Sequence, residues 1–283
     1  MYFQLLESLS LAGAPDKPNE DSFAAGMRLA CVFDGATVLG DNLMPGLSDA
    51  QWIAQFGARR LKAHAEAGEG SMRDWLRSAA TDAEKSFKAL RRRSPEENYE
   101  TPFASLMALS LSGSALDALW LGDCAALIRQ ADGRITMLGE TLSKRGRERE
   151  RARKMAGPKG GASASVREVF LPALRTARNK VNTKGSDWLF APDPRCAAHA
   201  DHKRIELAGD ALILLASDGF LALISDYEKY TPETLLSAAQ QRGLSVLGEE
   251  LRAIEAADPE GKLYPRFKNS DDATALLLTA RIG

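Results

Sequence analysis

The stretch ILLASDGFLAL, residues 213–223, places a carboxylate and a glycine in the middle of an apolar run. Ile213, Leu214 and Leu215 have the composition of a buried strand, and Gly219 is a natural turn residue. Asp218 should therefore lie where a core strand ends. A buried carboxylate is costly unless it is paired, hydrogen-bonded or bound to a metal. Capping of the turn or of a following helix would satisfy a single acid of this kind.

The same construction occurs twice more in the chain. In LACVFDGAT, residues 29–37, an apolar run ends in Asp34 and Gly35. In KNSDDATALLLTA, residues 268–280, Asp271 and Asp272 stand directly before another apolar run. Each of these acids is expected at the end of a strand, where a rigid sheet can hold it in place.

A further acidic pair, Glu20 and Asp21, lies in KPNEDSF, residues 17–23, just before another apolar stretch. Magnesium and manganese prefer carboxylate, carbonyl and water oxygens, which such acids supply without any Cys or His. The sequence therefore predicts an oxygen-liganded metal centre.

The composition narrows the possible functions. The 283 residues include 37 basic and 38 acidic residues, a balance that argues against a global nucleic-acid or anionic-membrane binder. The chain contains no apolar run of about 18 residues and no basic start followed by an apolar core. The three cysteines are odd in number and form no CxxC motif, which fits a reducing compartment. We expect a soluble protein of the cytoplasm that binds neither nucleic acid nor membrane; its oligomeric state stays open.

The N-terminal part is expected to contain strands over residues 3–12 and 22–34, followed by two amphipathic helices. The first helix opens with SDAQ, a capping box of Ser48 and Gln51, and the second starts near Ser71. Short apolar runs over residues 104–138 predict an antiparallel meander, with ADGR as a hairpin turn.

The C-terminal part is expected to contain more strands and a second helix pair. The strands are DWLF (187–190), residues 202–217 and residues 272–282. Between the last two lie a helix capped by Thr231 and a helix over residues 246–257. This order predicts an α+β fold, a central antiparallel β-sandwich flanked by pairs of antiparallel helices in four αββα layers. We expect a single domain over residues 1–283, with a mobile, flap-like excursion at about 139–187.

The motifs NED, VFDGAT, WLGDCAALI, ILLASDGF and DDATALLL follow one another in an order that resembles the metal-dependent protein phosphatases, the type 2C serine/threonine phosphatases. The resemblance extends over nearly the whole chain. It implies a phosphatase that hydrolyses phosphoserine and phosphothreonine in protein substrates. In this family a water that bridges two metal ions, Mn²⁺ or Mg²⁺, attacks phosphorus directly.

The resemblance also implies roles for particular residues. Asp34 bridges the two ions and Gly35 offers its carbonyl. Asp218 and Asp271 complete one ion, and Glu20 or Asp21 holds the other. Asp123, in LGDC, matches an acid associated with a third, weaker ion. Asp34 and Asp218 would thus act in catalysis through the metal-bound water.

Two positions depart from the family pattern. The family often has an Arg five residues before the acid of the first motif to grip the phosphate, but this chain has Asp16 there, and Lys17 is the nearest cation. Lys17 is therefore the expected phosphate contact, although Lys lacks the bidentate fork of Arg. Eukaryotic members carry a His after the DG pair, where this chain has Ala36 and Thr37.

Two other functions compete with this interpretation. Asp16 at the expected Arg position favours a catalytically weak relative that binds metal or phosphoprotein as a regulatory module. FDGAT is also similar to the DxDxT motif of phosphatases that form an aspartyl-phosphate, but Ala36 replaces the second Asp.

The remaining polar residues have simpler interpretations. His199 and His202 are expected on the surface or in packing. The Arg/Glu-rich run within residues 144–162 is typical of a solvated helix, and beside an active site it could select phosphoprotein substrates. Arg178 and Lys180 are expected in a solvated loop or at the edge of a substrate cleft.

Overall fold

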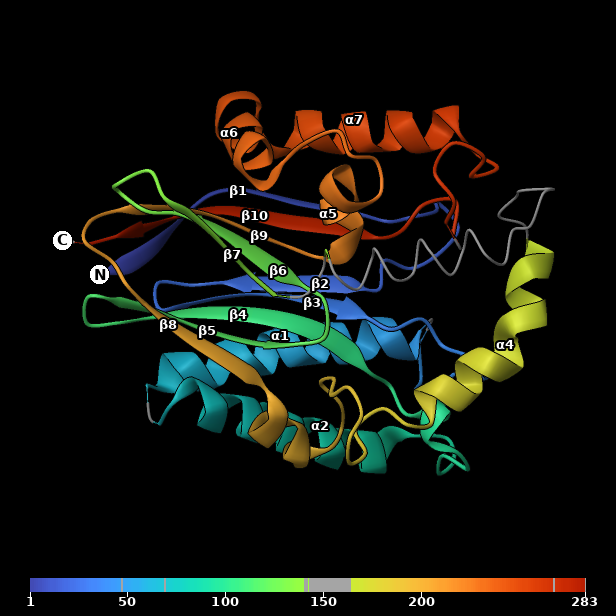
Figure 1. The fold of residues 1–283 in the computed structure, drawn as a ribbon. Helices are drawn as coiled ribbons and strands as arrows, with labels where there is room; N and C mark the ends of the chain where they lie inside the picture. Colours follow the sequence, from blue (N-terminus) through green and yellow to red (C-terminus); the bar gives the residue numbers. More distant parts are fainter. Residues whose placement is uncertain (47, 69, 140–141, 143–163, 267, 283) are drawn as a thin grey trace.

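The computed structural model describes residues 1–46, 48–68, 70–139, 142, 164–266 and 268–282, with side chains of the 164–178 helix described from residue 170. Two five-stranded sheets face each other, and every pair of neighbouring strands is antiparallel (Figure 1). The first sheet contains, in spatial order, β1 (Tyr2–Leu11), β10 (Ala273–Arg281), β9 (Ala211–Ala216), β6 (Ala125–Arg129) and β7 (Ile135–Leu138). The second contains β2 (Asp21–Ala25), β3 (Leu29–Gly35), β4 (Ala104–Ser112), β5 (Ala115–Leu121) and β8 (Asp201–Glu206).

Helices cover both outer faces of this sandwich. α1 (Asp49–Ala67) and α2 (Met72–Leu90) cover the second sheet, while α5 (Asp218–Ser225), α6 (Pro232–Arg242) and α7 (Leu244–Ala257) cover the first (Figure 1). Alternate residues of the central strands point inward between the sheets, so Val32, Met107 and Leu215 are buried in one shared cluster. The predicted α+β class with four αββα layers is confirmed.

The helix starts follow from capping by serine and threonine. Ser48, Ser71 and Thr231 each accept a hydrogen bond from the backbone N–H three residues on. The caps at Ser48 and Thr231 were predicted, and the second helix starts near Ser71 as expected. The predicted capping box at Ser48 is only half formed, because the Gln51 amide donates to the carbonyl of Asn19 at 3.1 Å instead of returning to Ser48. This contact ties the start of α1 to the loop before β2.

The structure corrects five details of the predicted elements. Residues 202–217, expected as one strand, form β8 in the second sheet and β9 in the first. Residues 22–34 form a hairpin of β2 and β3, since the chain turns at Gly26. The expected meander is divided, because β4 and β5 belong to one sheet and β6 and β7 to the other. DWLF contributes only an isolated bridge between Ala104 and Phe190. Residues 218–225 form α5, which was missed because a helix buried on all sides has no polar face to show a helical period.

Within residues 139–187, the structure describes the helix α4 (Ala164–Arg178). It lies at one end of the sandwich (Figure 1). The Arg175 side chain donates to the carbonyl of Leu39 at 2.8 Å and stacks over the Tyr99 ring at 4.8 Å. The charged run of residues 144–162 lies outside the described residues, so the flap and its role stay predictions. Among the described residues, no helix is both long and apolar enough to cross a membrane.

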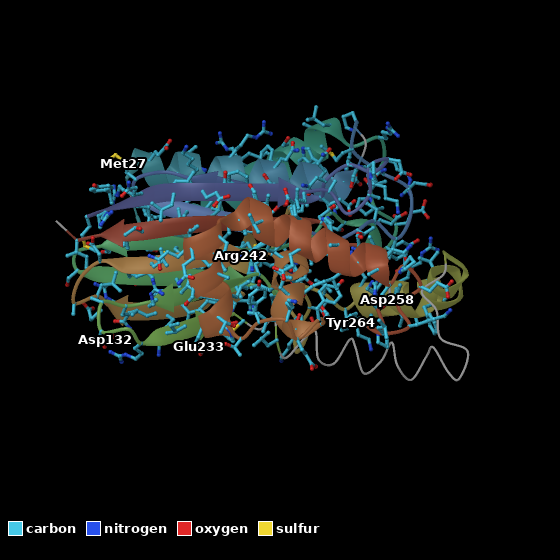
Figure 2. The ribbon with its side chains drawn as sticks, turned by 90° about the horizontal axis from the view of Figure 1, so that it is seen from above. Met27, Asp132, Glu233, Arg242, Asp258 and Tyr264 are labelled. Carbon is cyan, nitrogen blue, oxygen red and sulfur yellow. The ribbon has the colours of Figure 1, made fainter. Side chains whose placement is uncertain are left out.

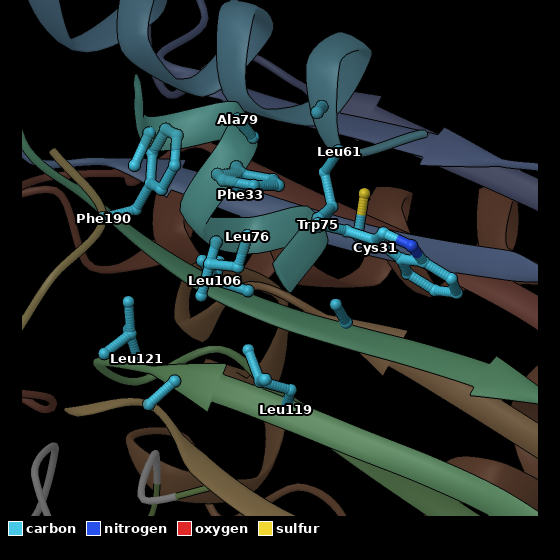
Figure 3. Packing of buried hydrophobic residues seen from close by; sticks show 14 of the residues in the cluster. Cys31, Phe33, Leu61, Trp75, Leu76, Ala79, Leu106, Leu119, Leu121 and Phe190 are labelled. Carbon is cyan, nitrogen blue, oxygen red and sulfur yellow. The ribbon is translucent and has the colours of Figure 1, made fainter. Parts of the chain in front are cut away.

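Gly57 allows α1 to pack directly on the second sheet. A Cβ there would lie 2.6 Å from Phe33 and 2.7 Å from Phe190, two rings that meet edge to face at a centroid distance of 5.2 Å (Figure 3). The rings fill the space that a side chain at position 57 would need. The contact therefore requires glycine, although alanine forms helices better.

We expect Gly57→Ala to lower the free energy of unfolding by about 1–3 kcal/mol, because the added methyl overpacks a full core. Ala63→Ser, on the exposed face of the same helix, is the matched control and should change it by about 0.5 kcal/mol or less. Urea denaturation followed by circular dichroism measures both. An unchanged midpoint for Gly57→Ala would contradict this account of the packing.

Candidate metal centre

Three carboxylates from separate segments converge at one edge of the sandwich. One oxygen from each of Asp34, Asp123 and Asp218 lies within 4.8 Å of the others. Asp34 is the penultimate residue of β3, Asp123 follows β5, and Asp218 is the first residue of α5. All three side chains are partly buried. The structure thus brings together three acids that are far apart in the sequence.

Asp34 lies beside Asp21, because these two residues are partners in the β2–β3 ladder. Asp21 is only 5% exposed. Its Oδ2 accepts a hydrogen bond of 2.7 Å from the hydroxyl of Ser217, whereas its Oδ1 is buried and has no hydrogen-bond partner among the described residues. A buried carboxylate oxygen without a hydrogen-bond donor is stabilised by a cation or an ordered water.

Glu20 points its carboxylate toward hydroxyl groups. Its Oε2 accepts from Thr37 at 2.7 Å and its Oε1 from Ser48 at 2.5 Å. The hydroxyl of Ser48 therefore connects the first turn of α1 to the acidic pair. Both oxygens of Glu20 have protein donors, whereas one oxygen of Asp21 has none among the described residues.

The two neighbouring acids before β10 have different environments. Asp272 accepts backbone hydrogen bonds of 2.7 Å from both Gly13 and Glu20, so it fixes the loop that carries the first acidic pair. Asp271 forms an ion pair with Lys268 at 2.7 Å, and its negative charge contributes to the raised pKa of Asp34. Asp271 therefore belongs to the acidic cluster, whereas Asp272 holds the backbone of the loop that carries Glu20 and Asp21.

Asp123 occupies the point where the chain passes from one sheet to the other. Its Oδ1 accepts a hydrogen bond of 2.5 Å from the hydroxyl of Ser105 on β4. Gly122 has a left-handed φ of +81°, and a Cβ there would meet the Ser105 side chain. The close turn directs Asp123 back toward Asp34.

Glycine follows Asp34 and Asp218 because the backbone is crowded at both places. A Cβ on Gly35 would lie 2.4 Å from the carbonyl oxygen of Ala50 and 2.6 Å from that of Glu20. A Cβ on Gly219 would lie 2.0 Å from the carbonyl oxygen of Asp272. Gly219 was expected to be a turn residue, but it lies in the first turn of α5. Its missing side chain lets the backbone before β10 pack directly against this helix.

The acids raise one another's pKa. Burial raises the pKa of Asp34, and the negative charges of Asp21 and then Asp218 raise it further. Burial also raises the pKa of Asp21, against the lowering effect of the hydrogen bond from Ser217. Such a cluster is unfavourable as free carboxylates and favourable around a cation. Its all-oxygen donor set, its convergence and the buried oxygen of Asp21 fit hard divalent ions such as Mn²⁺ or Mg²⁺.

Lys268 is a residue of the site that the sequence analysis missed. Its Nζ lies 2.7 Å from Oδ1 of Asp271 and 3.3 Å from Oγ1 of Thr37. Burial disfavours the ammonium, but the charges of Asp271, Asp34 and Asp218 outweigh that effect, so the pKa of Lys268 is raised. Its only sequence signal was its position three residues before Asp271.

Lys17, the expected phosphate contact, is exposed in the loop before β2. In the part of the chain that the structure describes, its side chain has no hydrogen bond or ion pair, and its backbone N–H donates to Ala14 at 3.3 Å. The histidines behave as expected, since His199 stacks on Trp188 at 3.7 Å and His202 pairs with Asp117 at 3.2 Å.

Comparison with known proteins connects this geometry to a family. The protein phosphatase 2C family model matches residues 14–148, which include the Glu20–Asp21 pair, Asp34 and Asp123. The resemblance noted in the sequence is confirmed: the chain is similar in sequence to the type 2C protein phosphatases over this region. A search of curated proteins found no match.

Solved structures show that the fold is shared over the whole chain. The Mycobacterium tuberculosis serine/threonine phosphatase PstP/Ppp superposes with a TM-score of 0.60 at 18% identity and 100% coverage of both chains. The catalytic domain of PstP in complex with two manganese ions gives 0.56 at 16%, covering 100% of this chain and 99% of that one. Stp1 from Staphylococcus aureus gives 0.56 at 15%, covering 99% and 96%.

We expect Gly219→Ala to weaken Mn²⁺ binding by about 10-fold or more, because the added methyl must push β10 and its acids away from α5. Gly209→Ala is the control. Gly209 precedes β9, at the end of that strand away from Asp218, and a Cβ there would meet only the Ala131 methyl, at 3.0 Å. Isothermal calorimetry with Mn²⁺ measures both affinities. Equal affinity in the two variants would show that this close contact does not shape the site.

Proposed function

We propose that this protein is a metal-dependent phosphoprotein phosphatase that hydrolyses phosphoserine and phosphothreonine. The observation that carries the proposal is the convergence of Asp34, Asp123 and Asp218 within 4.8 Å. The type 2C family match and the shared fold support it. The proposal takes the chain as a single phosphatase-like domain that acts in the cytoplasm.

Different acids of the site would hold different metal ions. Asp34 has acidic neighbours on two sides, Asp21 from β2 and Asp218 from α5, and would hold metal ions together with them and with the Gly35 carbonyl. Asp218 and Asp271 would complete one ion, the Glu20–Asp21 pair would hold the other, and Asp123 would serve a third. Two divalent ions bound there would supply an activated water for attack on phosphorus and would neutralise charge on the phosphate.

The surrounding residues fix these acids before substrate arrives. Ser217 donates its hydroxyl to Asp21 at 2.7 Å and accepts a hydrogen bond from the backbone N–H of Thr274 at 3.0 Å, so one side chain connects β2, β9 and β10. Asp272 holds the loop before Asp21 through the N–H groups of Gly13 and Glu20. Preorganised ligands of this kind lose little free energy to rearrangement during the reaction.

A covalent cysteine mechanism is not supported by the surroundings of the thiols. Cys31, Cys124 and Cys196 are all buried. Burial raises the pKa of Cys31 and of Cys196 to about 12, and burial with nearby acids raises that of Cys124. A thiol with such a pKa is protonated at neutral pH and is a poor nucleophile.

The proposed function predicts metal-dependent hydrolysis of an aryl phosphate and of a phosphothreonine peptide. With Mn²⁺ present, Asp34→Asn and Asp218→Asn should each lower kcat/KM by about 100-fold or more, because each removes a charged ligand. Asp132→Asn, in the β6–β7 turn, is the control and should retain activity. A chelator should abolish turnover by the wild type.

The same assay distinguishes the second candidate function, a metal- or phosphoprotein-binding module with weak activity. Asp16 at the position where relatives often have Arg is the feature that favours it. Binding of Mn²⁺ by calorimetry without turnover of either substrate would support the module and reject the phosphatase.

Alkylation tests the role of the cysteines. We expect iodoacetamide at pH 7.5 to leave Mn²⁺-dependent hydrolysis unchanged over an hour, because all three thiols are buried and protonated. Mass spectrometry of the folded protein should find them unmodified, and unfolding in urea should make them reactive. Parallel loss of activity and modification of one cysteine would contradict this expectation.

A further inference from the structure

Lys268, from the C-terminal part of the chain, brings a side-chain ammonium into direct contact with the acidic cluster. Its Nζ donates hydrogen bonds to Oδ1 of Asp271 at 2.7 Å and to Oγ1 of Thr37 at 3.3 Å. Asp271 lies two residues before β10 and Thr37 two residues after β3, so Lys268 connects the segments next to two strands of the site. Thr37 in turn donates to Glu20 at 2.7 Å. The ammonium therefore lies between the acids of β10 and those of the N-terminal pair.

The loop that carries Lys268 is fixed by a buried ion pair. Asp258, only 5% exposed, accepts backbone hydrogen bonds from Lys262, Leu263 and Tyr264 and pairs with Arg266 at 3.0 Å. Arg266 also donates to the carbonyl of Asn269, next to Lys268, at 3.0 Å. In Figure 2, Asp258 and Tyr264 lie toward the end of the molecule away from Met27, which occupies the β2–β3 turn. The loop thus holds Lys268 at the end where Asp21 and Asp34 lie.

The ammonium keeps capacity for another partner. A lysine ammonium has three N–H donors, and two of them have the partners Asp271 and Thr37. The side chain remains 47% exposed. An anion that approaches from solvent can therefore reach the third donor without breaking either contact.

The charge of the site makes such a cation useful. The acids of the site, which are Glu20, Asp21, Asp34, Asp123, Asp218 and Asp271, carry six negative charges when ionised. Two divalent ions therefore leave a net negative charge, which only a third ion would cancel. A phosphate dianion is repelled by that charge, and an ammonium at the rim reduces the repulsion. Asp16 stands at the sequence position where relatives often have Arg, and in the described structure the Lys17 side chain has no hydrogen bond or ion pair.

We propose that Lys268 binds the phosphate group of the substrate and takes the place of the missing arginine. The proposal rests on the phosphatase function proposed above and assigns a specific binding residue to it. Asp271 and Thr37 are positioning residues for Lys268, because they hold its Nζ beside the acids. The assignment concerns phosphate binding and does not require Lys268 to bind metal.

Binding of inorganic phosphate to the Mn²⁺-loaded protein, measured by calorimetry, tests this assignment apart from turnover. Lys268→Met keeps the length of the side chain and removes its charge, so the Kd for phosphate should rise about 10- to 100-fold, as expected for loss of a charge-assisted hydrogen bond. Lys268→Arg should restore most of the affinity. Lys262→Met, in the same loop, is the matched control because its Nζ pairs with Glu260 on the surface.

A titration with Mn²⁺ alone separates phosphate binding from support of the metal site. Lys268→Met should bind Mn²⁺ as tightly as the wild type or more tightly, because it removes a positive charge next to Asp271. Loss of Mn²⁺ affinity by 10-fold or more would overturn the assignment and make Lys268 a support for Asp271. An unchanged phosphate Kd in Lys268→Met, or a larger increase in Lys17→Met, would also overturn it.

Kinetics distinguish failure of this inference from failure of the proposed function. With an aryl phosphate, Lys268→Met should raise KM and the inhibition constant of phosphate together, while Lys262→Met leaves both unchanged. If the wild type binds phosphate through Lys268 but turns over no substrate, the inference stands and the phosphatase function fails. If the wild type turns over substrate and Lys268→Met matches it in both constants, the function stands and the inference fails.

Discussion

The repulsion between carboxylates at one edge of the sandwich is the constraint on which the rest of the site depends. Asp34, Asp123 and Asp218 converge although burial and mutual charge make this unfavourable without a cation. The sandwich provides the rigidity, because Asp34 is held inside a strand and Asp218 at the start of a buried helix. Apolar packing of the two sheets and of both helix layers therefore provides the free energy that keeps the acids together.

The close approach of backbones is the second element of this design. Gly35 and Gly219 each stand next to an acid and touch carbonyl oxygens of neighbouring segments. Ser217 and Asp272 then connect the strands through side-chain hydrogen bonds. The site is consequently a product of contacts between β2, β3, β9 and β10, and a small change in any of these contacts displaces several ligands at once.

The chain resembles the type 2C phosphatases in sequence and fold, and we propose a different source of positive charge beside its acids. It lacks an Arg at position 16, and its DG pair is followed by Ala36 and Thr37. Lys268 reaches the acids from the loop before β10, and Thr37 contacts both Lys268 and Glu20. The positive charge for the phosphate is thus proposed to come from the opposite end of the sequence, while the same edge of the sandwich is used.

The sequence by itself determined the four layers, the starts of α1, α2 and α6, and the placement of Asp34, Asp123 and Asp218 at the ends of strands. Apolar runs, serine and threonine caps and acids at strand ends are local patterns, and local physical chemistry produces them. Only the tertiary structure decided that α5 is a helix, that β5 and β6 belong to different sheets, and that Lys268 rather than Lys17 contacts the acids. These features depend on packing between residues far apart in the chain, such as the contact of Gly219 with Asp272, and no local pattern encodes them.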